Sequence, residues 1–255
     1  GQSRQMLMTH VRLSGLCAVA AALVLCASCG PDSPRQVRKD ALGGDPPPAR
    51  VATGRGSIVG RVVYGGDPPH RAKLLVIKDR DVCGVVEHRD PSLIVSESGG
   101  IANVVVSVEG PTPDDGEWTS SRSYVLDQRD CAYEPHVIVV PSGVPLQILN
   151  SDGVLHNVHT FSEENRPVNV AQPASLTSMT MTFDSPERVR LRCDVHGWMD
   201  AWAVVVDHPH HAVTDADGKF TLPNVPAGNL ALVFWHETLG EQTTSVVVEA
   251  ESEAA

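Results

Sequence analysis

The stretch RVRLRCDVHGWMDAWAVVVD, residues 188–207, contains two short runs of strand-forming residues separated by a compact loop. In the first run Val189 and Leu191 alternate with arginines, which is the pattern of a β-strand with one buried face and one exposed face. The second run, residues 201–207, is rich in β-branched valine, which favours strands. The stretch therefore predicts a strand, a tight loop that carries a cysteine, a histidine and a methionine, and a second strand.

Similar strand-forming runs recur on both sides of this stretch. They are bounded by glycine, proline, aspartate or asparagine, and no segment has the apolar period of a long amphipathic helix. Together with the 21 Gly and 19 Pro of the chain, they favour β-structure with many turns. The further predicted strands are 57–64, 73–79, 101–110, 136–143 and 145–150. We predict an all-β sandwich.

Length and charge narrow the class of protein. The chain has 255 residues, 42% of them hydrophobic, which is enough for one large core or two small ones. It carries 31 Asp and Glu against 20 Lys and Arg, a net charge of −11. Such a chain is poorly suited to bind the phosphate backbone of a nucleic acid and suits a basic partner better.

The N-terminal residues 1–28 resemble a secretory signal peptide. Basic residues precede an apolar run over 13–28, which is short for a membrane span and typical of the core of such a signal. Small residues then precede Cys29, as in the lipobox of bacterial lipoproteins, although Cys26 stands where that motif usually has leucine. The resemblance implies a lipid anchor on Cys29 and a location in the periplasm or cell envelope. Secretion without a lipid is the alternative.

Two further regions flank the predicted core. Residues 29–55 are rich in proline, glycine and charge, which predicts a flexible tether. Residues 212–237 follow a turn, strand, turn, strand pattern that resembles the second half of carboxypeptidase-regulatory-like β-sandwich modules. The segment 56–62 has the G-x-[IV]-x-G-x-V form with which those modules open. The resemblance implies a split module, residues 56–110 and 208–250, that encloses another domain.

Two segments carry the candidate metal chemistry: Asn150 to His159, and Cys193 to Met199. A thiolate and imidazoles bind Cu(II) in a trigonal plane, and a weak axial methionine also favours Cu(I). A tight loop after a strand can bring a cysteine, a histidine and a methionine around one point, whereas the remaining histidine must arrive from a distant strand. A zinc half-site and a catalytic cysteine–histidine pair are the alternatives.

The cysteine count fits this interpretation. Outside the predicted leader only Cys83, Cys131 and Cys193 remain. An exported compartment permits disulfides, and an odd number leaves one thiol for another role. We expect a disulfide between Cys83 and Cys131, with Cys193 reserved for the metal. The alternative is that all three are buried thiols.

The C-x2-H-x2-M pattern before a valine-rich strand, together with the HNVH sequence at 156–159, resembles the cupredoxins, and most closely the amicyanins and plastocyanins. The resemblance implies a Greek-key β-sandwich over residues 118–207 with one type 1 (blue) copper. Gly197 stands where the amicyanins have proline. Carried over by position, the four copper ligands are His156, Cys193, His196 and Met199, and Asn157 is the neighbour that braces Cys193.

The other histidines are expected to have structural roles. His159 follows His156 by three residues, which on a strand places it on the opposite face. We expect His136 and His236 to pack or to lie on the surface, and residues 208–211 to form a solvated turn.

The resemblance implies a membrane-tethered electron carrier that performs no bond chemistry. It would pass electrons through an exposed edge of His196 to redox proteins such as cytochromes. A subunit of a larger envelope or respiratory complex, with the cupredoxin fold as scaffold, is one alternative. A copper-binding accessory or chaperone protein is the other. A copper nitrite reductase would need a second copper centre, for which the sequence offers no histidine cluster, so we do not expect an enzyme.

Overall fold

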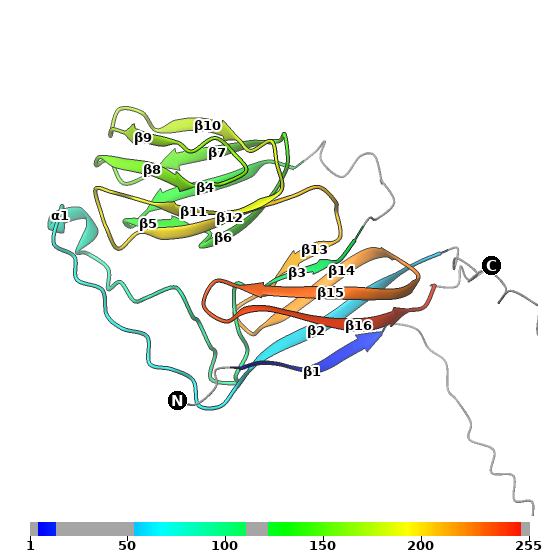
Figure 1. Ribbon diagram of the computed structural model, residues 1–255. Helices are drawn as coiled ribbons and strands as arrows, with labels where there is room; N and C mark the ends of the chain where they lie inside the picture. Colours follow the sequence, from blue (N-terminus) through cyan, green and yellow to red (C-terminus); the bar gives the residue numbers. More distant parts are fainter. Residues whose placement is uncertain (1–4, 14–53, 111–121, 251–255) are drawn as a thin grey trace, which may run out of the picture.

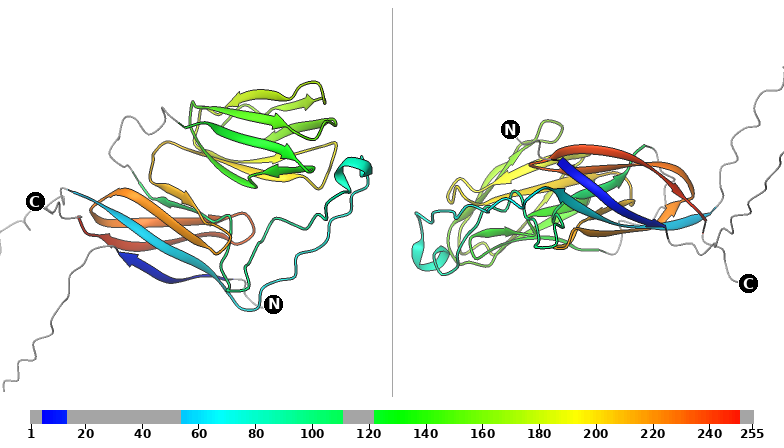
Figure 2. Two further views of the ribbon diagram at one scale, coloured as in Figure 1. Left: turned by 180° about the vertical axis from the view of Figure 1, so that it is seen from behind. Right: turned by 90° about the horizontal axis from the view of Figure 1, so that it is seen from below.

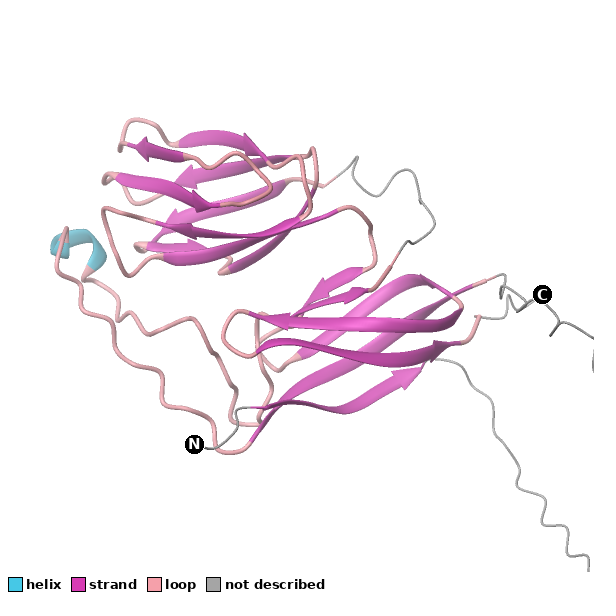
Figure 3. Ribbon diagram, viewed as in Figure 1, coloured by secondary structure: helices cyan, strands magenta, loops and turns pink. Residues whose placement is uncertain are grey.

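The computed structural model describes residues 5–13, 54–110 and 122–250. Strands dominate these residues and fold into two β-sandwiches, and one short helix lies at the outer end of the first sandwich (Figures 1 and 3). The predicted all-β fold class is confirmed. No helix in the described part of the chain is long and apolar enough to cross a membrane. Cys29, the apolar run of the predicted leader after Leu13, and residues 29–53 of the predicted tether lie outside the described residues.

The first sandwich consists of two facing sheets. Neighbouring strands are antiparallel except for the parallel pairs β4–β7 and β6–β12. The four-stranded sheet has the order β10-β7-β4-β5, and the five-stranded sheet has the order β6-β12-β11-β8-β9. Their bounds are β4 Tyr124–Arg129, β5 Ala132–Glu134, β6 Val137–Pro141, β7 Pro145–Asn150, β8 His156–Phe161, β9 Asn169–Gln172, β10 Ser178–Thr182, β11 Glu187–Arg192 and β12 Asp200–Val206.

The core of the first sandwich follows from the alternation seen in the sequence. Val189 and Leu191 of β11 are fully buried, whereas the arginines beside them lie at the surface or are partly covered. They pack in one cluster with Leu126 and Ile148 from the facing sheet. Cys193 belongs to the same cluster. The candidate metal-binding loop is therefore continuous with a rigid hydrophobic core.

The second sandwich takes strands from both ends of the described chain. Strands β1, β2 and β3 precede the first sandwich, and β13 to β16 follow it. The sheet orders are β1-β2-β14 and β13-β3-β15-β16. The bounds are β1 Gln5–Leu13, β2 Arg55–Gly65, β3 Val105–Val108, β13 His211–Val213, β14 Lys219–Pro226, β15 Gly228–His236 and β16 Gly240–Val248.

An irregular excursion between β2 and β3 connects the two sandwiches. Residues 66–92, here called the strap, leave the second sandwich and run to the far end of the first, where helix α1 (Arg80–Cys83) forms the tip (Figures 1 and 2). The two arms of the strap are joined by a bridge between Lys73 and Arg89. The Leu74 amide also donates to the His88 carbonyl at 2.9 Å.

The strand predicted over residues 73–79 is wrong. These residues belong to the strap, and apart from the isolated bridge at Lys73 they take part in no strand. Leu75 and Ile77 are 78% and 74% exposed, so the apolar alternation that resembles a half-buried strand has no sheet face to cover. The alternation therefore predicts a strand where the structure has an exposed connecting segment.

The two sandwiches meet through apolar and polar contacts. Val105 and Trp235 of the second sandwich share a buried cluster with Val137, Val139, Val204 and Val206 of the first. The Trp202 indole donates to Glu237 at 2.9 Å, and the Arg188 guanidinium lies 5.3 Å from the centre of the Trp235 ring. The sandwiches are therefore packed against each other as well as joined by the strap.

Candidate metal centre

The predicted ligands come from two neighbouring regions of the five-stranded sheet. His156 is the first residue of β8, and Cys193 directly follows β11. β11 pairs with β8 on one side and with β12 on the other. Arg192 at the end of β11 is opposite both His159 and Asp200, so the loop over 193–199 is held at its base by two ladders. This pairing brings His156 next to the loop.

Three donor atoms converge in this region. The Cys193 Sγ lies 3.9 Å from His156 Nδ1 and 3.8 Å from His196 Nδ1, and the two Nδ1 atoms are 2.9 Å apart. Such separations suit atoms that share one ion through bonds of about 2.0–2.3 Å. Both histidines are 0% exposed and Cys193 is 1% exposed. The three atoms therefore form a preassembled and buried set of two nitrogens and one sulfur.

Met199, on the same loop as Cys193 and His196, adds a thioether sulfur to the set of candidate donors. Its side chain is 1% exposed and belongs to the same buried cluster as Cys193. The Met199 amide donates to the His196 carbonyl at 2.9 Å, and the Cys193 amide donates to the Met199 carbonyl at 3.2 Å. These backbone bonds fold the loop into a compact turn. The buried cluster of His156, Cys193, His196 and Met199 resembles a type 1 copper site.

Asn157 ties β8 to the ligand loop. Its side-chain oxygen accepts hydrogen bonds from the amides of Asp194 at 2.5 Å and Val195 at 3.3 Å. Its side-chain nitrogen donates to Asn169 at 2.7 Å. The His196 amide in turn points at the Cys193 sulfur at 3.3 Å. The asparagine thus holds the residues next to Cys193, which is the location that the sequence resemblance implied for it.

Each candidate histidine ligand has a carboxylate on its remaining ring nitrogen. Asp152 Oδ2 lies 2.8 Å from His156 Nε2, and Asp79 Oδ2 lies 2.8 Å from His196 Nε2. A carboxylate accepts the Nε2 hydrogen, so the Nδ1 lone pair is left for a metal. Sequence reasoning missed both aspartates. The position of Asp152, four residues before His156, was a usable signal, whereas Asp79 lies 117 residues from His196 and gave none.

The expected exposed edge of His196 is not found. Its ring is fully buried, and Nε2 faces Asp79 at the tip of the strap. Trp198 covers another side, with its ring centre 5.0 Å from that of His196. The edge is covered because the strap, which extends from the second sandwich, reaches the ring of His196 at this location.

The electrostatics of the cluster favour a bound cation. Burial opposes the charged form of His156, but hydrogen bonds with Asp152 and Cys193 outweigh it and raise its pKa to about 9. Burial also opposes the Cys193 thiolate, but hydrogen bonds from His156 and His196 outweigh it and lower its pKa to about 6. A thiolate therefore faces a protonated imidazole at neutral pH, and a metal cation can displace that proton.

Cys83 and Cys131 are joined in a disulfide with an S–S distance of 1.99 Å. Among the described residues Cys193 is the free cysteine, and it is buried. Cys131 also lies near Asp152 and His156, but its sulfur is used in the disulfide. The pairing and the free thiol are those expected from the cysteine count.

The other histidines lie outside the donor cluster. His159 stacks on Phe161 and contacts Asp194 at 3.1 Å, away from the donors. His136 contacts Glu237, and burial lowers the pKa of His236 to about 4. The solvated turn expected over residues 208–211 is wrong in part, because His210 is 2% exposed and the following histidine begins β13.

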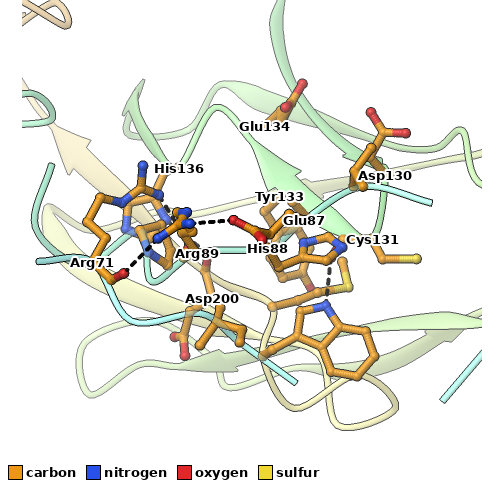
Figure 4. Close-up of a pocket in the computed structure, with 16 residues that line it drawn as sticks. Arg71, Glu87, His88, Arg89, Asp130, Cys131, Tyr133, Glu134, His136 and Asp200 are labelled. Atoms are coloured by element: carbon orange, nitrogen blue, oxygen red, sulfur yellow. Dashed lines mark hydrogen bonds and ion pairs between the residues drawn. The ribbon is translucent and has the colours of Figure 1, made fainter. Parts of the chain in front are cut away.

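A cavity of about 360 Å³ lies beside the cluster, between the strap and the first sandwich. Met199 and Trp198 line it from the ligand loop. Figure 4 shows Glu87 and Arg89 of the strap paired with each other across from Asp130 and Cys131. The Trp198 indole donates to the Cys131 carbonyl at 3.1 Å. The ion pair is internal to the strap and the indole bond is internal to the first sandwich, so these groups stabilise the two walls of the cavity separately.

Among the comparisons with known proteins, only the one with solved structures finds matches. No family model and no curated protein matches the chain. A copper-containing nitrite reductase from Thermus scotoductus SA-01 is 15% identical over 34% of this chain and 23% of its own, with a TM-score of 0.30.

Two amicyanin variants in the Cu(I) form are 18% and 17% identical. Each match covers 40% of this chain and 98% of the amicyanin, with a TM-score of 0.31. The assignment of the site rests on its own donor atoms and not on these likenesses.

Proposed function

We propose that the protein is a type 1 copper protein that carries electrons between redox partners. The observation that carries this proposal is the buried convergence of His156 Nδ1, Cys193 Sγ and His196 Nδ1, with Met199 on the same loop. Thiolate and thioether donors favour copper over harder ions such as magnesium or calcium, and imidazole is compatible with either copper state. When bound, copper would supply a one-electron couple between Cu(I) and Cu(II).

The chain holds this donor set in place in a way that suits electron transfer. The loop over 193–199 is anchored by β11 and β12, and Asn157 ties it to β8. Asp152 and Asp79 fix the two imidazole rings. Donors that are fixed before the metal changes its charge have little rearrangement to make, which favours rapid electron exchange.

The same geometry disfavours the other chemical roles. Four protein donors leave no open position for a substrate, whereas catalytic metal sites keep one. We therefore propose that the protein is not an enzyme. A chaperone that hands on Cu(I) needs ligands that a partner can reach, and here each donor residue is at most 1% exposed.

The cellular setting is part of the proposal. A leader over residues 1–28 would export the chain, and a lipid on Cys29 would then anchor it in the periplasm or cell envelope. The Cys83–Cys131 disulfide supports an oxidising compartment. The net charge of −11 favours partners with a basic docking face, among redox proteins such as cytochromes.

A second setting is favoured by the second sandwich. In the described part of the chain this sandwich supplies no residue to the donor cluster, although it contains β2, β3 and β13 to β16 in addition to β1, which lies within the proposed leader. A domain of that size, joined to a redox centre, suits a subunit of a larger envelope or respiratory complex. In that setting the copper chemistry is unchanged and the partner is permanent.

Metal loading followed by redox cycling tests the proposal. One copper per chain should bind, and repeated treatment with ascorbate and ferricyanide should return the same visible spectrum without loss of metal. A His159→Ala variant serves as control, since this nearby ring lies outside the cluster. A protein that holds Cu(I) only, or that releases copper in each cycle, would contradict electron transfer and favour a chaperone.

A further inference from the structure

We propose that Asp79 is a positioning residue for the copper ligand His196 and that the strap thereby closes the metal centre. This inference rests on the proposed function and deepens it. Asp79 Oδ2 lies 2.8 Å from His196 Nε2, on the side of the ring opposite to the Nδ1 that faces Cys193. The contact joins the strap to the ligand loop.

The burial of the two residues shows which of them faces solvent. His196 is fully buried, whereas the side chain of Asp79 is 34% exposed. The carboxylate therefore stands between the imidazole and the surrounding water. Asp79 is the outer end of a hydrogen-bonded chain that leads from the donor cluster to the surface.

The Asp79 carboxylate does not cap helix α1. Asp79 precedes α1 at the N-cap position, where an aspartate side chain ordinarily accepts a hydrogen bond from the first turn of the helix. Here the side chain makes no such bond, and the backbone carbonyl of Asp79 accepts from the Val82 and Cys83 amides at 3.0 and 2.8 Å. The residue also adopts the left-handed conformation, with φ of 48° and ψ of 45°. Aspartate tolerates this conformation better than most residues do, and its carboxylate, which does not cap the helix, contacts His196 instead.

The strap is fastened to the first sandwich next to Asp79. Cys83, four residues later, is cross-linked to Cys131. The carbonyls of both cysteines are hydrogen bonded, that of Cys83 with the His88 ring at 2.8 Å and that of Cys131 with the Trp198 indole at 3.1 Å. The carboxylate is therefore delivered by a segment whose position is already fixed, so little conformational entropy is lost when the contact forms.

The contact has two chemical consequences for His196. First, a carboxylate on Nε2 stabilises the tautomer that carries its hydrogen there, and Nδ1 is then unprotonated and directed at the metal. Second, the negative charge close to the ring stabilises the more highly charged Cu(II) state over Cu(I). Asp79 is thus expected to strengthen metal retention and to lower the reduction potential. Asp152 has the same relation to His156, but it lies on the first sandwich itself.

Three variants separate the charge of Asp79 from its hydrogen bond. Asp79→Asn keeps an acceptor oxygen and removes the charge, whereas Asp79→Ala removes both. Asp81→Asn removes the same charge from the exposed surface of α1 and is the matched control. For Asp79→Ala we expect copper capture by a chelator to be about 10–100-fold faster, the size of effect seen when a residue that supports a metal ligand is removed. For Asp79→Asn we expect a higher reduction potential with a smaller change in capture rate.

A nitrogen-15 NMR spectrum of the metal-free protein, in which no metal fixes the tautomer of His196, gives a readout that a purely structural role would not change. The wild type and Asp81→Asn should carry the His196 hydrogen on Nε2 alone, and Asp79→Ala should lose that uniform assignment or exchange the hydrogen rapidly with water. Retention of the Cys83–Cys131 disulfide and of the thermal midpoint checks that each variant is folded.

The outcomes separate this inference from the proposed function. A wild type that binds no copper through Cys193 would overturn both. A wild type with an intense thiolate-to-Cu(II) band, together with Asp79 variants whose chelator rate, potential and His196 tautomer equal those of Asp81→Asn, would overturn the positioning role and leave the proposed function intact. If both Asp79 variants fail to fold while Asp81→Asn folds, the aspartate is required for the fold and the positioning role is rejected.

Discussion

Cys193 Sγ lies 3.9 Å from His156 Nδ1, although 37 residues separate the two in the chain. Burial opposes both charges, but hydrogen bonds with Asp152 and Cys193 raise the pKa of the imidazole, and hydrogen bonds from His156 and His196 lower the pKa of the thiol. The protein thus holds the thiolate, which is the metal-binding form of cysteine, at neutral pH. The chemistry of the site depends on this pair.

The thiolate of the metal-free protein should titrate far below the usual range of a thiol. The pKa of Cys193 is lowered to about 6, so ultraviolet thiolate absorbance should be half developed near pH 6. Burial alone would raise this pKa, and the hydrogen bond from His156 is the largest effect that lowers it. His156→Ala should therefore move the midpoint to higher pH, whereas His159→Ala should leave it unchanged. A wild-type midpoint near the ordinary thiol value of 9.0 would contradict the pairing.

Met199→Leu should keep copper bound and raise the reduction potential. The thioether is a weak axial donor that the more highly charged Cu(II) uses, and its replacement by an apolar side chain removes that stabilisation. Cyclic voltammetry compares the variant with the wild type. Met181→Leu, on β10 of the facing sheet, is the matched control and should leave the potential unchanged. An unchanged or lowered potential in Met199→Leu would argue against Met199 as the axial ligand.

Asn157→Ala should loosen the ligand loop. It removes the acceptor for the Asp194 and Val195 amides, and an amide left without a partner costs about 1–3 kcal/mol when it is buried. Chemical denaturation of the metal-free variant measures this loss. Asn169→Ala removes the acceptor of the Asn157 side-chain nitrogen and a donor to the exposed Asp194 carboxylate, but it leaves both loop amides paired and should cost less. Equal losses in the two variants would show that the tie to the loop contributes no specific stability.

Loss of the Cys83–Cys131 disulfide should lower the thermal midpoint without removing copper at room temperature. The bond closes a loop of 48 residues, worth about 4 kcal/mol in the chain-entropy model. In a protein of this size that corresponds to a decrease of roughly 10 °C. The double variant Cys83→Ser and Cys131→Ser, followed by calorimetry and copper analysis, tests this. An unchanged midpoint would mean that the strap is held by its other contacts.

The ligand loop could be predicted because the residues that identify it lie close together in the sequence. Val189 and Leu191 mark the strand before it, the valines of β12 mark the strand after it, and the donor types lie within seven residues of sequence. The partner histidine was found through the resemblance of the HNVH segment to the cupredoxins, since it lies far from the loop in sequence. Burial of alternate residues then fixes which face each side chain takes.

The strap could not be predicted because its role depends on contacts far apart in sequence. Its residues 73–79 alternate like a strand, yet Leu75 and Ile77 face solvent. The aspartate at the end of that run reaches a histidine 117 positions later. Nothing in the local pattern distinguishes this carboxylate from any other acidic residue before a short helix. Only the disulfide expected between Cys83 and Cys131 indicated that this region lies near the first sandwich.

The optical spectrum of the Cu(II)-loaded protein, compared with that of Cys193→Ser, tests the central claim most directly. The wild type should show an intense visible thiolate-to-Cu(II) band, because the Cys193 sulfur is the donor of that transition. Cys193→Ser should lose the band while it keeps the far-ultraviolet circular dichroism of a folded β-protein, because a serine hydroxyl is too hard a ligand to replace the thiolate. A serine variant that stays as intensely coloured as the wild type, or a copper-loaded wild type without the band, would contradict the assignment.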